Sequence, residues 1–433
     1  MATVLRLVQL AEDLHSVGAV ELAASTSVNL LNAFDDLSDQ VPVENALSPG
    51  LASRIAEIAY LVALQLLQLR AAPECTSILQ QLGCTYRLSD AVLQWSIQNA
   101  HAHAGLLHRG HPCTLIPALP DDVFNVLEHG FSASAKFWSE TGYMNQDSPF
   151  SSILYDLDPS NAMEAAINSI FQDLKQSHLD MSGILAAEWW AHMREPTSAH
   201  QLHFDLDESR IGVGAAKYRL LHPVLSSVLY LSSTGGPTVV LEQSATDTLA
   251  EQAFLCNPKE NVLFCFPGKY LHGVLPGQQP VGIEPGGTQR ISLIIAWWGH
   301  GLQAKAGAPG TGPCRSLPTA PEALLTQHSQ TWLSDFPLPG GAMPPQRRLE
   351  WKPAALVAPA WVPVARSVQA TVEKAVQGSL GKGHVKVAGA SEGDEGLTRD
   401  LGGAARTRNL PLPGLRFFLR AADEVRQVYV PQS

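Results

Sequence analysis

The hydrophobic pattern changes character along the chain. In residues 1–135, apolar side chains recur at steps of three and four, most clearly over 7–17 and 55–69, which is the spacing of one helix face. Ser89-Asp90 stands before an apolar run, as at the start of a helix, and a further helix is predicted over 161–176. The first part of the chain is therefore expected to be mainly helical.

The apolar segments between residues 187 and 298 are shorter and richer in β-branched and aromatic side chains, which is typical of strands. Gly235-Gly236-Pro237 and Pro285-Gly286-Gly287 are strong turn signals between them. Many short strands without intervening helices favour a jelly roll over a parallel sheet. The candidate strands are 189–193, 201–205, 227–231, 238–243, 261–266 and 290–298.

These patterns predict an α+β fold in three parts. A mainly helical region (1–150) precedes a jelly-roll domain (151–300), and an extension rich in Pro, Gly and Ala follows (301–433). Within that extension, residues 376–408 have the composition of a flexible or disordered linker. The last stretch, 414–430, regains apolar and aromatic residues and is expected to be a short ordered segment.

The charge and cysteine content narrow the class of protein. A formal net charge of −11 and a pI near 5.7 argue against a binder of nucleic acid or of an anionic membrane surface. Six cysteines without a Cys-x-x-Cys pair favour reduced thiols in an intracellular, cytoplasmic protein. No secretory signal is visible, and the apolar run 58–69 is shorter than the roughly 20 residues that span a bilayer. A soluble protein is expected; organelle targeting and oligomeric state stay open.

A candidate metal site lies among the predicted strands. His203 and Asp205 are two residues apart, so on a regular strand both side chains project from one face. His272, which follows another apolar strand, would complete the two imidazoles and one carboxylate of a non-haem iron(II) centre. Such a centre leaves positions open for a chelating cosubstrate and O₂, whereas a structural metal site is closed by four protein ligands.

Arg290 leads an almost wholly apolar strand and would carry its charge into the barrel. A buried arginine needs a carboxylate partner, because an unpaired buried charge is very costly. A bound dicarboxylate can supply that partner through a bidentate pair with the guanidinium group.

These residues together resemble a known family. The order His-x-Asp, distant His and basic residue on the last strand is similar to that of the 2-oxoglutarate- and iron(II)-dependent oxygenases. The segments HPVLSSVLYLSSTGGPTVV and FPGKYLHGVLPG…GGTQRISLIIAWW resemble the prolyl-4-hydroxylase-like branch, and the likeness covers roughly residues 185–300. Two departures are a longer stretch before Arg290, with a looped insertion around 278–285, and Ser232 where Asn or Asp is common.

The resemblance implies a fold and an activity. The fold would be a double-stranded β-helix, with Fe(II) held by His203, Asp205 and His272. Arg290, with Ser292 beside it and a hydrogen bond from Tyr230, would bind the distal carboxylate of 2-oxoglutarate. The enzyme would couple oxidative decarboxylation of 2-oxoglutarate, to succinate and CO₂, with hydroxylation of a substrate by O₂.

Other residues near the motif have competing interpretations. His200 is an alternative ligand, but it faces the other way on a strand. One of Trp189 and Trp190 is expected in the core and the other beside substrate, and Asp207 hydrogen-bonds nearby or lines the mouth of the site. The cluster His101, His103, His108, His111 and Cys113 matches no standard zinc spacing and is interpreted as a solvated segment.

Two hypotheses from other classes remain beside the oxygenase. One is a catalytically silent jelly-roll binding module, which the intact ligand set disfavours. The other is a metal cupin that does not use 2-oxoglutarate, which would have no evident use for Arg290. The substrate stays open between a prolyl residue of a protein, a free amino acid and another small molecule.

Overall fold

The computed structural model describes five stretches of the chain, with short gaps, and a few separate residues near 10–29 and 332–336. The stretches are 49–94, 111–141, 151–207, 221–302 and 349–364. Their helices are α3 (Pro49–Gln68), α4 (Ala72–Gln81), α5 (Asp90–Leu93), α7 (Asp121–Gly130), α8 (Lys136–Glu140) and α9 (Ala162–Lys175). Their strands are β1 (Tyr86–Leu88), β2 (Cys113–Ile116), β3 (Ser152–Tyr155), β4 (Ala186–Arg194), β5 (His200–His203), β6 (Leu225–Tyr230), β7 (Thr238–Leu241), β8 (Ala253–Cys256), β9 (Val262–Pro267), β10 (Leu271–Val274), β11 (Arg290–Trp298), β12 (Glu350–Pro353), β13 (Ala355–Val357) and β14 (Trp361–Pro363).

The helix predictions that fall on described residues are confirmed. The apolar stripe predicted over 55–69 lies in α3 up to residue 68, and the helix predicted over 161–176 corresponds to α9. Ser89 caps α5, because its hydroxyl accepts a hydrogen bond from the Val92 backbone N–H at 3.2 Å.

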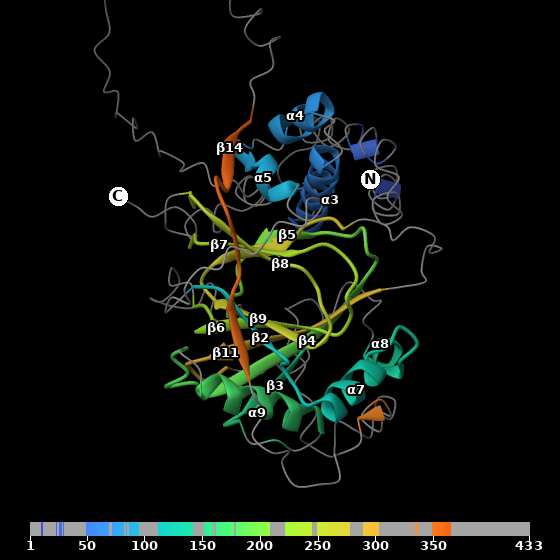
Figure 1. Cartoon of the computed structure of the whole chain (residues 1–433). Coiled ribbons are helices and arrows are strands. Elements are labelled where there is room, and N and C mark those ends of the chain that lie inside the picture. Colours follow the sequence, from blue (N-terminus) through green and yellow to red (C-terminus); the bar gives the residue numbers. More distant parts are fainter. Residues whose placement is uncertain are drawn as a thin grey trace, which may run out of the picture.

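Two antiparallel sheets face each other and form the centre of the molecule (Figure 1). The larger sheet has the order β12-β2-β9-β6-β11-β4-β3, and the smaller has the order β13-β8-β7-β10-β5. From β4 to β11 the chain passes repeatedly from one sheet to the other. This mixed architecture with large antiparallel sheets is consistent with the predicted jelly roll.

Apolar packing divides the molecule into layers. Helices α7 to α9 pack on the outer face of the larger sheet, through side chains such as Phe137, Ile170 and Trp297. Helices α3 to α5 cover the outer face of the smaller sheet (Figure 1), where Leu64 belongs to the same cluster as Leu271. A third cluster, which includes Val228, Val240, Phe254, Phe264 and Ile294, fills part of the space between the sheets.

The strand predictions are accurate where an apolar run is long. Strand β11 occupies 290–298 as predicted, whereas β5 ends at His203, so Asp205 lies just beyond it. The prediction missed the four-residue strands β2, β8 and β10, because such short runs carry little periodic signal.

Residues 349–364 connect all the layers. Strand β12 pairs with β2, β13 pairs with β8, and β14 pairs with β1 beside the N-terminal helices (Figure 1). The division into 1–150, 151–300 and 301–433 stays a prediction; strands from all three parts enter the sheets. The linker predicted at 376–408 and the ordered segment predicted at 414–430 lie outside the described residues.

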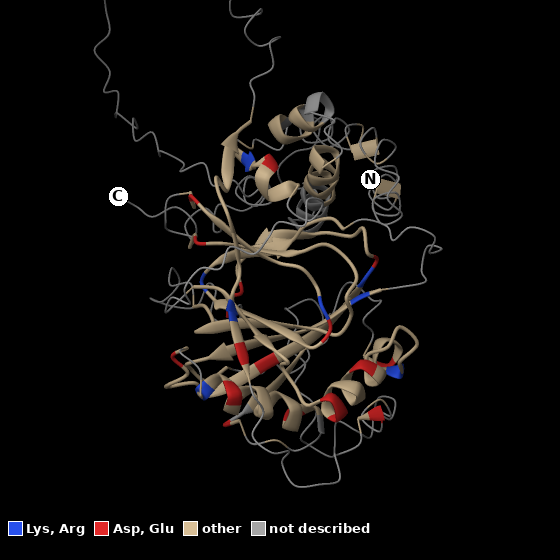
Figure 2. Ribbon diagram, viewed as in Figure 1, with Lys and Arg blue, Asp and Glu red and all other residues tan. Residues whose placement is uncertain are grey.

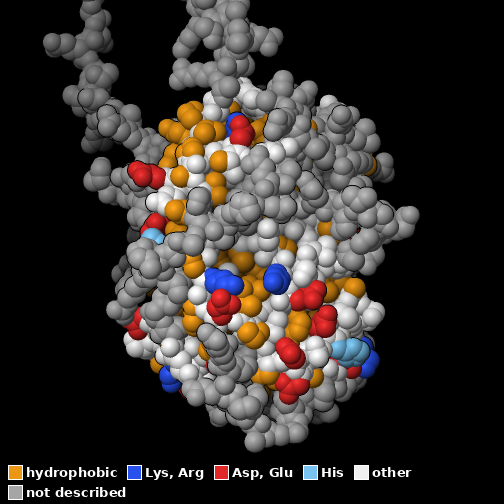
Figure 3. Space-filling model, viewed as in Figure 1, with side chains coloured by type: hydrophobic (Ala, Val, Ile, Leu, Met, Phe, Trp, Pro, Cys, Tyr) orange, Lys and Arg blue, Asp and Glu red, His pale blue; other side chains and the backbone are white. Residues whose placement is uncertain are grey.

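Charged residues among the described ones occur on the covering helices and on the strands (Figure 2). Helix α7 carries Asp121, Asp122 and Glu128 (Figure 2). On the face drawn in Figure 3, the described basic side chains are few and interspersed with acidic ones. Within the described stretches, no helix combines the length and the apolar character needed to cross a membrane.

Candidate metal centre and adjoining cavity

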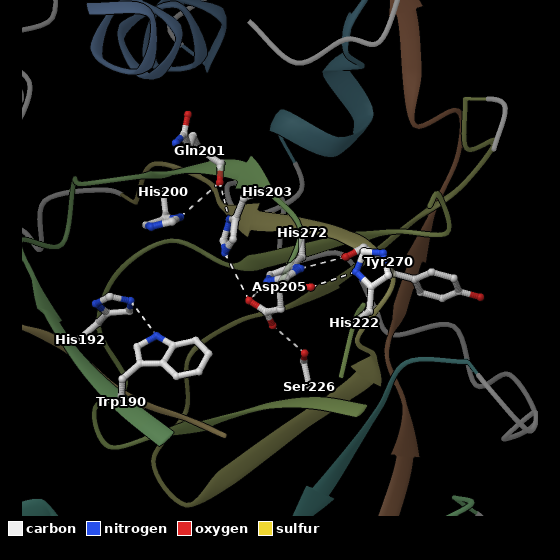
Figure 4. A network of polar contacts seen from close by, with 10 residues as sticks. All are labelled: Trp190, His192, His200, Gln201, His203, Asp205, His222, Ser226, Tyr270 and His272. Atoms are coloured by element: carbon white, nitrogen blue, oxygen red, sulfur yellow. Dashed lines mark hydrogen bonds and ion pairs between the residues drawn. The ribbon is translucent and has the colours of Figure 1, made fainter. Parts of the chain in front are cut away.

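The two candidate histidine ligands face each other across a strand pair. His203 ends β5 and His272 lies on β10, and the two are direct partners in the antiparallel register. Asp205 follows β5 and turns its carboxylate toward both rings (Figure 4). Its Oδ1 lies 3.9 Å from His203 Nε2 and 3.6 Å from His272 Nε2, and the three ligand atoms all lie within 4.8 Å of one another.

Backbone carbonyl groups orient both imidazole rings. His203 Nδ1 lies 2.9 Å from the carbonyl oxygen of Gln201, and His272 Nδ1 lies 2.9 Å from that of Tyr270 (Figure 4). A carbonyl oxygen can only accept, so each Nδ1 carries a proton, and in the neutral form of each ring Nε2 has a lone pair for a metal. Carbonyl or carboxylate partners of this kind commonly fix the tautomer of metal-binding histidines.

Ser226 holds the remaining oxygen of the carboxylate. Its hydroxyl donates to Asp205 Oδ2 at 2.6 Å, and both residues are buried. Burial by itself would raise the pKa of Asp205, but His272, His203 and the Ser226 hydrogen bond together hold that pKa far below its usual range. Asp205 is therefore ionised at neutral pH, as a metal ligand must be.

The histidines respond to the same surroundings in opposite directions. Burial, with the nearby His272, lowers the pKa of His203 to about 4 despite the attraction of Asp205. Burial also acts to lower the pKa of His272, but the closer Asp205 carboxylate outweighs it and raises that pKa above its ordinary value.

This donor set fits a divalent transition metal. Two atoms bound to one ion at about 2.1 Å each can lie up to about 4.2 Å apart. The distances from Asp205 Oδ1 to the two Nε2 atoms, 3.9 and 3.6 Å, fall within that limit. Two imidazoles with one carboxylate suit iron(II) and leave coordination positions unfilled by protein.

A cavity that is partly open to solvent adjoins the ligands, and its space, counted together with the open part, is about 490 Å³. Its walls follow the two-residue repeat of paired strands, because residues two apart on a strand face the same side. On β11 the residues facing inward are Arg290, Ser292 and Ile294, and their direct partners on β4 are Arg194, His192 and Trp190. The remaining lining residues are His200, His203, Val228, Thr238, Phe266, His272, Gly273 and Val274.

Arg290 reaches this cavity from a buried position. Its Nη1 donates to Ser292 Oγ at 3.2 Å, its Nη2 to Thr238 Oγ1 at 3.1 Å, and its Nε to the Gly236 carbonyl at 3.4 Å. These three acceptors are neutral oxygens, which position the guanidinium group without cancelling its charge.

The turn between β6 and β7 forms the wall behind this arginine. Gly235 has φ of +99°, and a Cβ there would lie 2.7 Å from Arg290 Cδ, so the turn requires glycine on both counts. Ser232 accepts a hydrogen bond from the Ile291 backbone N–H at 2.9 Å, which ties the turn to the start of β11.

Tyr230 lies beside Arg290 rather than on the cavity wall. Its hydroxyl is 2.8 Å from Thr238 Oγ1 and 3.3 Å from the Cys256 carbonyl, and its ring faces the guanidinium carbon at 5.5 Å. A direct hydrogen bond from Tyr230 to 2-oxoglutarate stays a prediction. The hydrogen bond of Tyr230 to Thr238, which also accepts from Arg290, links Tyr230 to the site.

The two neighbouring tryptophans separate as alternation on a strand requires. Trp189 is fully buried against Phe137 and Trp332 on the outer face of the larger sheet. Trp190 lines the cavity and donates from Nε1 to His192 Nε2 at 3.2 Å (Figure 4). Of this pair, only Trp190 is placed to meet a bound molecule.

The other sequence candidates lie outside the ligand group. His200 lines the cavity, with its ring 4.6 Å from that of His203, but the cluster of potential ligands does not include it. Asp207 Oδ2 lies 3.0 Å from His300 Nε2, and Asp207 does not line the cavity. His101, His103 and His108 lie outside the described residues, whereas Cys113 is buried on β2.

Sequence reasoning missed Ser226, Thr238, His192 and Arg194. Alternation could have found the last two, since His192 stands two residues after Trp190 within the predicted strand 189–193, and Arg194 stands four residues after Trp190, just beyond that strand. Ser226 and Thr238 became visible only with the register between strands, because their partners are more than 20 residues away.

Comparison with known proteins gives only weak likenesses to solved structures. No protein-family model and no curated protein matches the sequence. A Pseudomonas putida prolyl-4-hydroxylase has 19% identity and a TM-score of 0.30, covering 44% of this chain and 94% of that one. HygX from Streptomyces hygroscopicus, solved with nickel and 2-oxoglutarate bound, has 13% identity and a TM-score of 0.24, covering 42% and 81%. SnoN, a non-heme alpha ketoglutarate dependent epimerase from nogalamycin biosynthesis, has 11% identity and a TM-score of 0.26, covering 60% and 93%.

Those identities and scores are too low to assign this chain to a family. The proposed function below therefore rests on its own side chains.

Proposed function

We propose that this chain is an iron(II)- and 2-oxoglutarate-dependent oxygenase. The carrying observation is that the His203, Asp205 and His272 cluster adjoins the cavity that also exposes the guanidinium group of Arg290. A metal with unfilled positions and a fixed cation in one cavity suit a cosubstrate that chelates at one end and carries a carboxylate at the other.

Each residue has a proposed role in binding. His203 and His272 would bind the metal through Nε2, and Asp205 through Oδ1. Arg290 would pair with the distal carboxylate of 2-oxoglutarate, and Ser292 and Thr238 would hold the guanidinium group in place. Tyr230 is proposed to support this pair through Thr238.

Fe(II) bound there would supply the O₂ chemistry that couples decarboxylation of 2-oxoglutarate to succinate and CO₂ with hydroxylation of a substrate. The protein side chains would orient the cosubstrate and substrate and exclude water from the cavity. The apolar side chains Val228, Phe266 and Ile294 form the dry walls of the cavity. Trp190 is the proposed contact for substrate, which is a prolyl residue or a small molecule.

We further propose that β4 to β11 form a double-stranded β-helix. The four-strand orders β4-β11-β6-β9 and β5-β10-β7-β8 within the two sheets support this assignment. The quoted sequence segments support the prolyl-4-hydroxylase-like branch. An intracellular, cytoplasmic location is supported by the described cysteines, which are all buried and form no disulfide with one another.

Anaerobic reconstitution tests the proposal. Addition of Fe(II) and then 2-oxoglutarate should produce a weak visible charge-transfer band, which His203→Ala should abolish. The folded wild-type protein giving no band would reject the proposal. Screening succinate release against pools of amino acids, peptides and small metabolites would then identify the substrate.

A further inference from the structure

A second cation faces the cavity beside Arg290. Arg194 is the last residue of β4, the direct partner of Arg290 in the strand register, and one of the lining residues. It is half-buried, whereas Arg290 is almost fully buried. The two guanidinium groups thus enter the same cavity at different depths, and they need different partners.

Within the described part of the chain, Arg194 makes one side-chain hydrogen bond. Its Nη1 donates to the Ala199 carbonyl at 3.3 Å, which uses one of five N–H donors. The adjacent carboxylate, Glu195, instead accepts a hydrogen bond from Gln289 Nε2 at 2.8 Å. Among the residues that the structure describes, no carboxylate forms an ion pair with Arg194.

The surroundings of Arg194 are polar but uncharged. Trp190 donates to His192 Nε2, so that nitrogen is unprotonated and the ring is neutral. His200 is the next lining residue, and its Nδ1 lies 3.2 Å from the Gln201 carbonyl. No aspartate or glutamate is among the described residues that line the cavity.

The balance of charge points to an anionic substrate. Two guanidinium groups and a divalent metal bring four positive charges, whereas Asp205 and 2-oxoglutarate bring three negative ones. Counted over the described groups alone, the loaded cavity keeps one positive charge, and Arg194 is the described group for which none of these charges is a counterion. A carboxylate carries one negative charge at neutral pH, whereas a phosphomonoester carries nearly two.

We propose that Arg194 binds a carboxylate of the substrate, with Trp190, His192 and His200 forming the wall against which the rest of that molecule lies. This assignment rests on the proposed oxygenase function and narrows the substrate class to small monocarboxylates. A planar guanidinium group suits a carboxylate because it can donate two parallel hydrogen bonds.

Ligand-observed NMR of full-length protein loaded with Mn(II) and saturating 2-oxoglutarate, without O₂, tests the assignment. The paramagnetic ion broadens the proton lines of any molecule held near it, and a Zn(II)-loaded sample gives the reference. The probes are acetate, benzoate and N-benzoylglycine, each paired with its amide, and phenyl phosphate. We expect at least one carboxylate to bind about tenfold or more tightly than its amide, since hydrogen bonds to charged groups are the stronger ones.

Two variants test whether Arg194 causes the preference for a carboxylate over its amide. Arg194→Gln should remove the preference for carboxylate, and Lys352→Gln, an exposed cation on β12, should keep it. Affinity for 2-oxoglutarate should change less than about threefold in Arg194→Gln. Equal binding of acids and amides in every pair, or tighter binding of phenyl phosphate, would overturn the assignment.

Failure of the proposed oxygenase function would give a different result in the binding measurements. If wild-type protein shows no metal-dependent binding of 2-oxoglutarate, the oxygenase proposal itself fails. If wild-type binding is normal but Arg194→Gln loses tenfold or more in 2-oxoglutarate affinity, the oxygenase proposal stands and Arg194 serves the cosubstrate instead.

Discussion

Removal of one hydroxyl group should weaken the metal centre measurably. Ser226 donates to Asp205 Oδ2 at 2.6 Å, and Ser226 is fully buried. In Ser226→Ala the carboxylate loses a short, charge-assisted hydrogen bond and gains no water to replace it. A hydrogen bond to a charged group contributes about 1.5–3 kcal/mol, and loss of such a supporting contact commonly costs about 10- to 100-fold in metal affinity. We therefore expect Mn(II) or Fe(II) to bind about 10- to 100-fold more weakly.

The adjacent serine provides a matched control. Ser227 is equally buried, but it points to the opposite face of β6, where its hydroxyl donates to the Ile295 carbonyl at 3.1 Å and accepts from Trp297 Nε1 at 3.0 Å. Ser227→Ala should lower Tm and leave metal affinity unchanged. Anaerobic metal titration by calorimetry measures both variants. Wild-type affinity in Ser226→Ala would refute the reasoning, as would equal loss in the two variants.

Three further predictions follow from the same geometry. The pKa of His203 is about 4, and that of His272 is raised above its ordinary value, so His272 alone carries a titrating proton at pH values between the two. Metal binding in that range should expel one proton, so that metal affinity rises tenfold per pH unit and levels off above the His272 pKa. A hundredfold rise per unit in a pH titration would contradict this. Trp189→Ala should lower the free energy of unfolding by about 3–5 kcal/mol in a denaturant titration, whereas Trp190→Ala should lower it clearly less. Equal losses in the two variants would show that the side chains are not divided between core and cavity. Gly235→Ala should lower the free energy of unfolding by about 1–3 kcal/mol because of the positive φ, and it should weaken 2-oxoglutarate binding because the new Cβ displaces Arg290. Normal 2-oxoglutarate binding in a titration of this variant would contradict the second effect.

Parts of the fold were predictable because their signals are local. The nine-residue strand β11 and the helices α3 and α9 carry long apolar patterns, and Ser89 marks a helix start by its own chemistry. Several short strands, unlike β5 and β7, were missed because their pairing depends on residues far away in the sequence. Strand β2, for example, is held by β9 and β12, and the latter comes from the predicted extension.

The candidate site was likewise predictable only in part. Side-chain chemistry and spacing singled out His203, Asp205 and His272, and the register of β5 against β10 brings them together. Spacing on a regular strand was not the whole reason, since β5 ends at His203 and Asp205 lies in the segment that follows. The hydrogen bond from Ser226 to Asp205 depends on the packing of β6 against the segment that holds Asp205. No local sequence pattern encodes that packing.

Titration of 2-oxoglutarate into metal-free and Mn(II)-loaded protein, without O₂, tests the central claim most directly. If one cavity holds the metal and the Arg290 guanidinium group at opposite ends of the same cosubstrate, affinity should require both. We predict tight binding to loaded wild-type protein, and a loss of tenfold or more either without metal or in Arg290→Gln. Binding that is equally tight without metal, or unchanged in Arg290→Gln, would contradict the account.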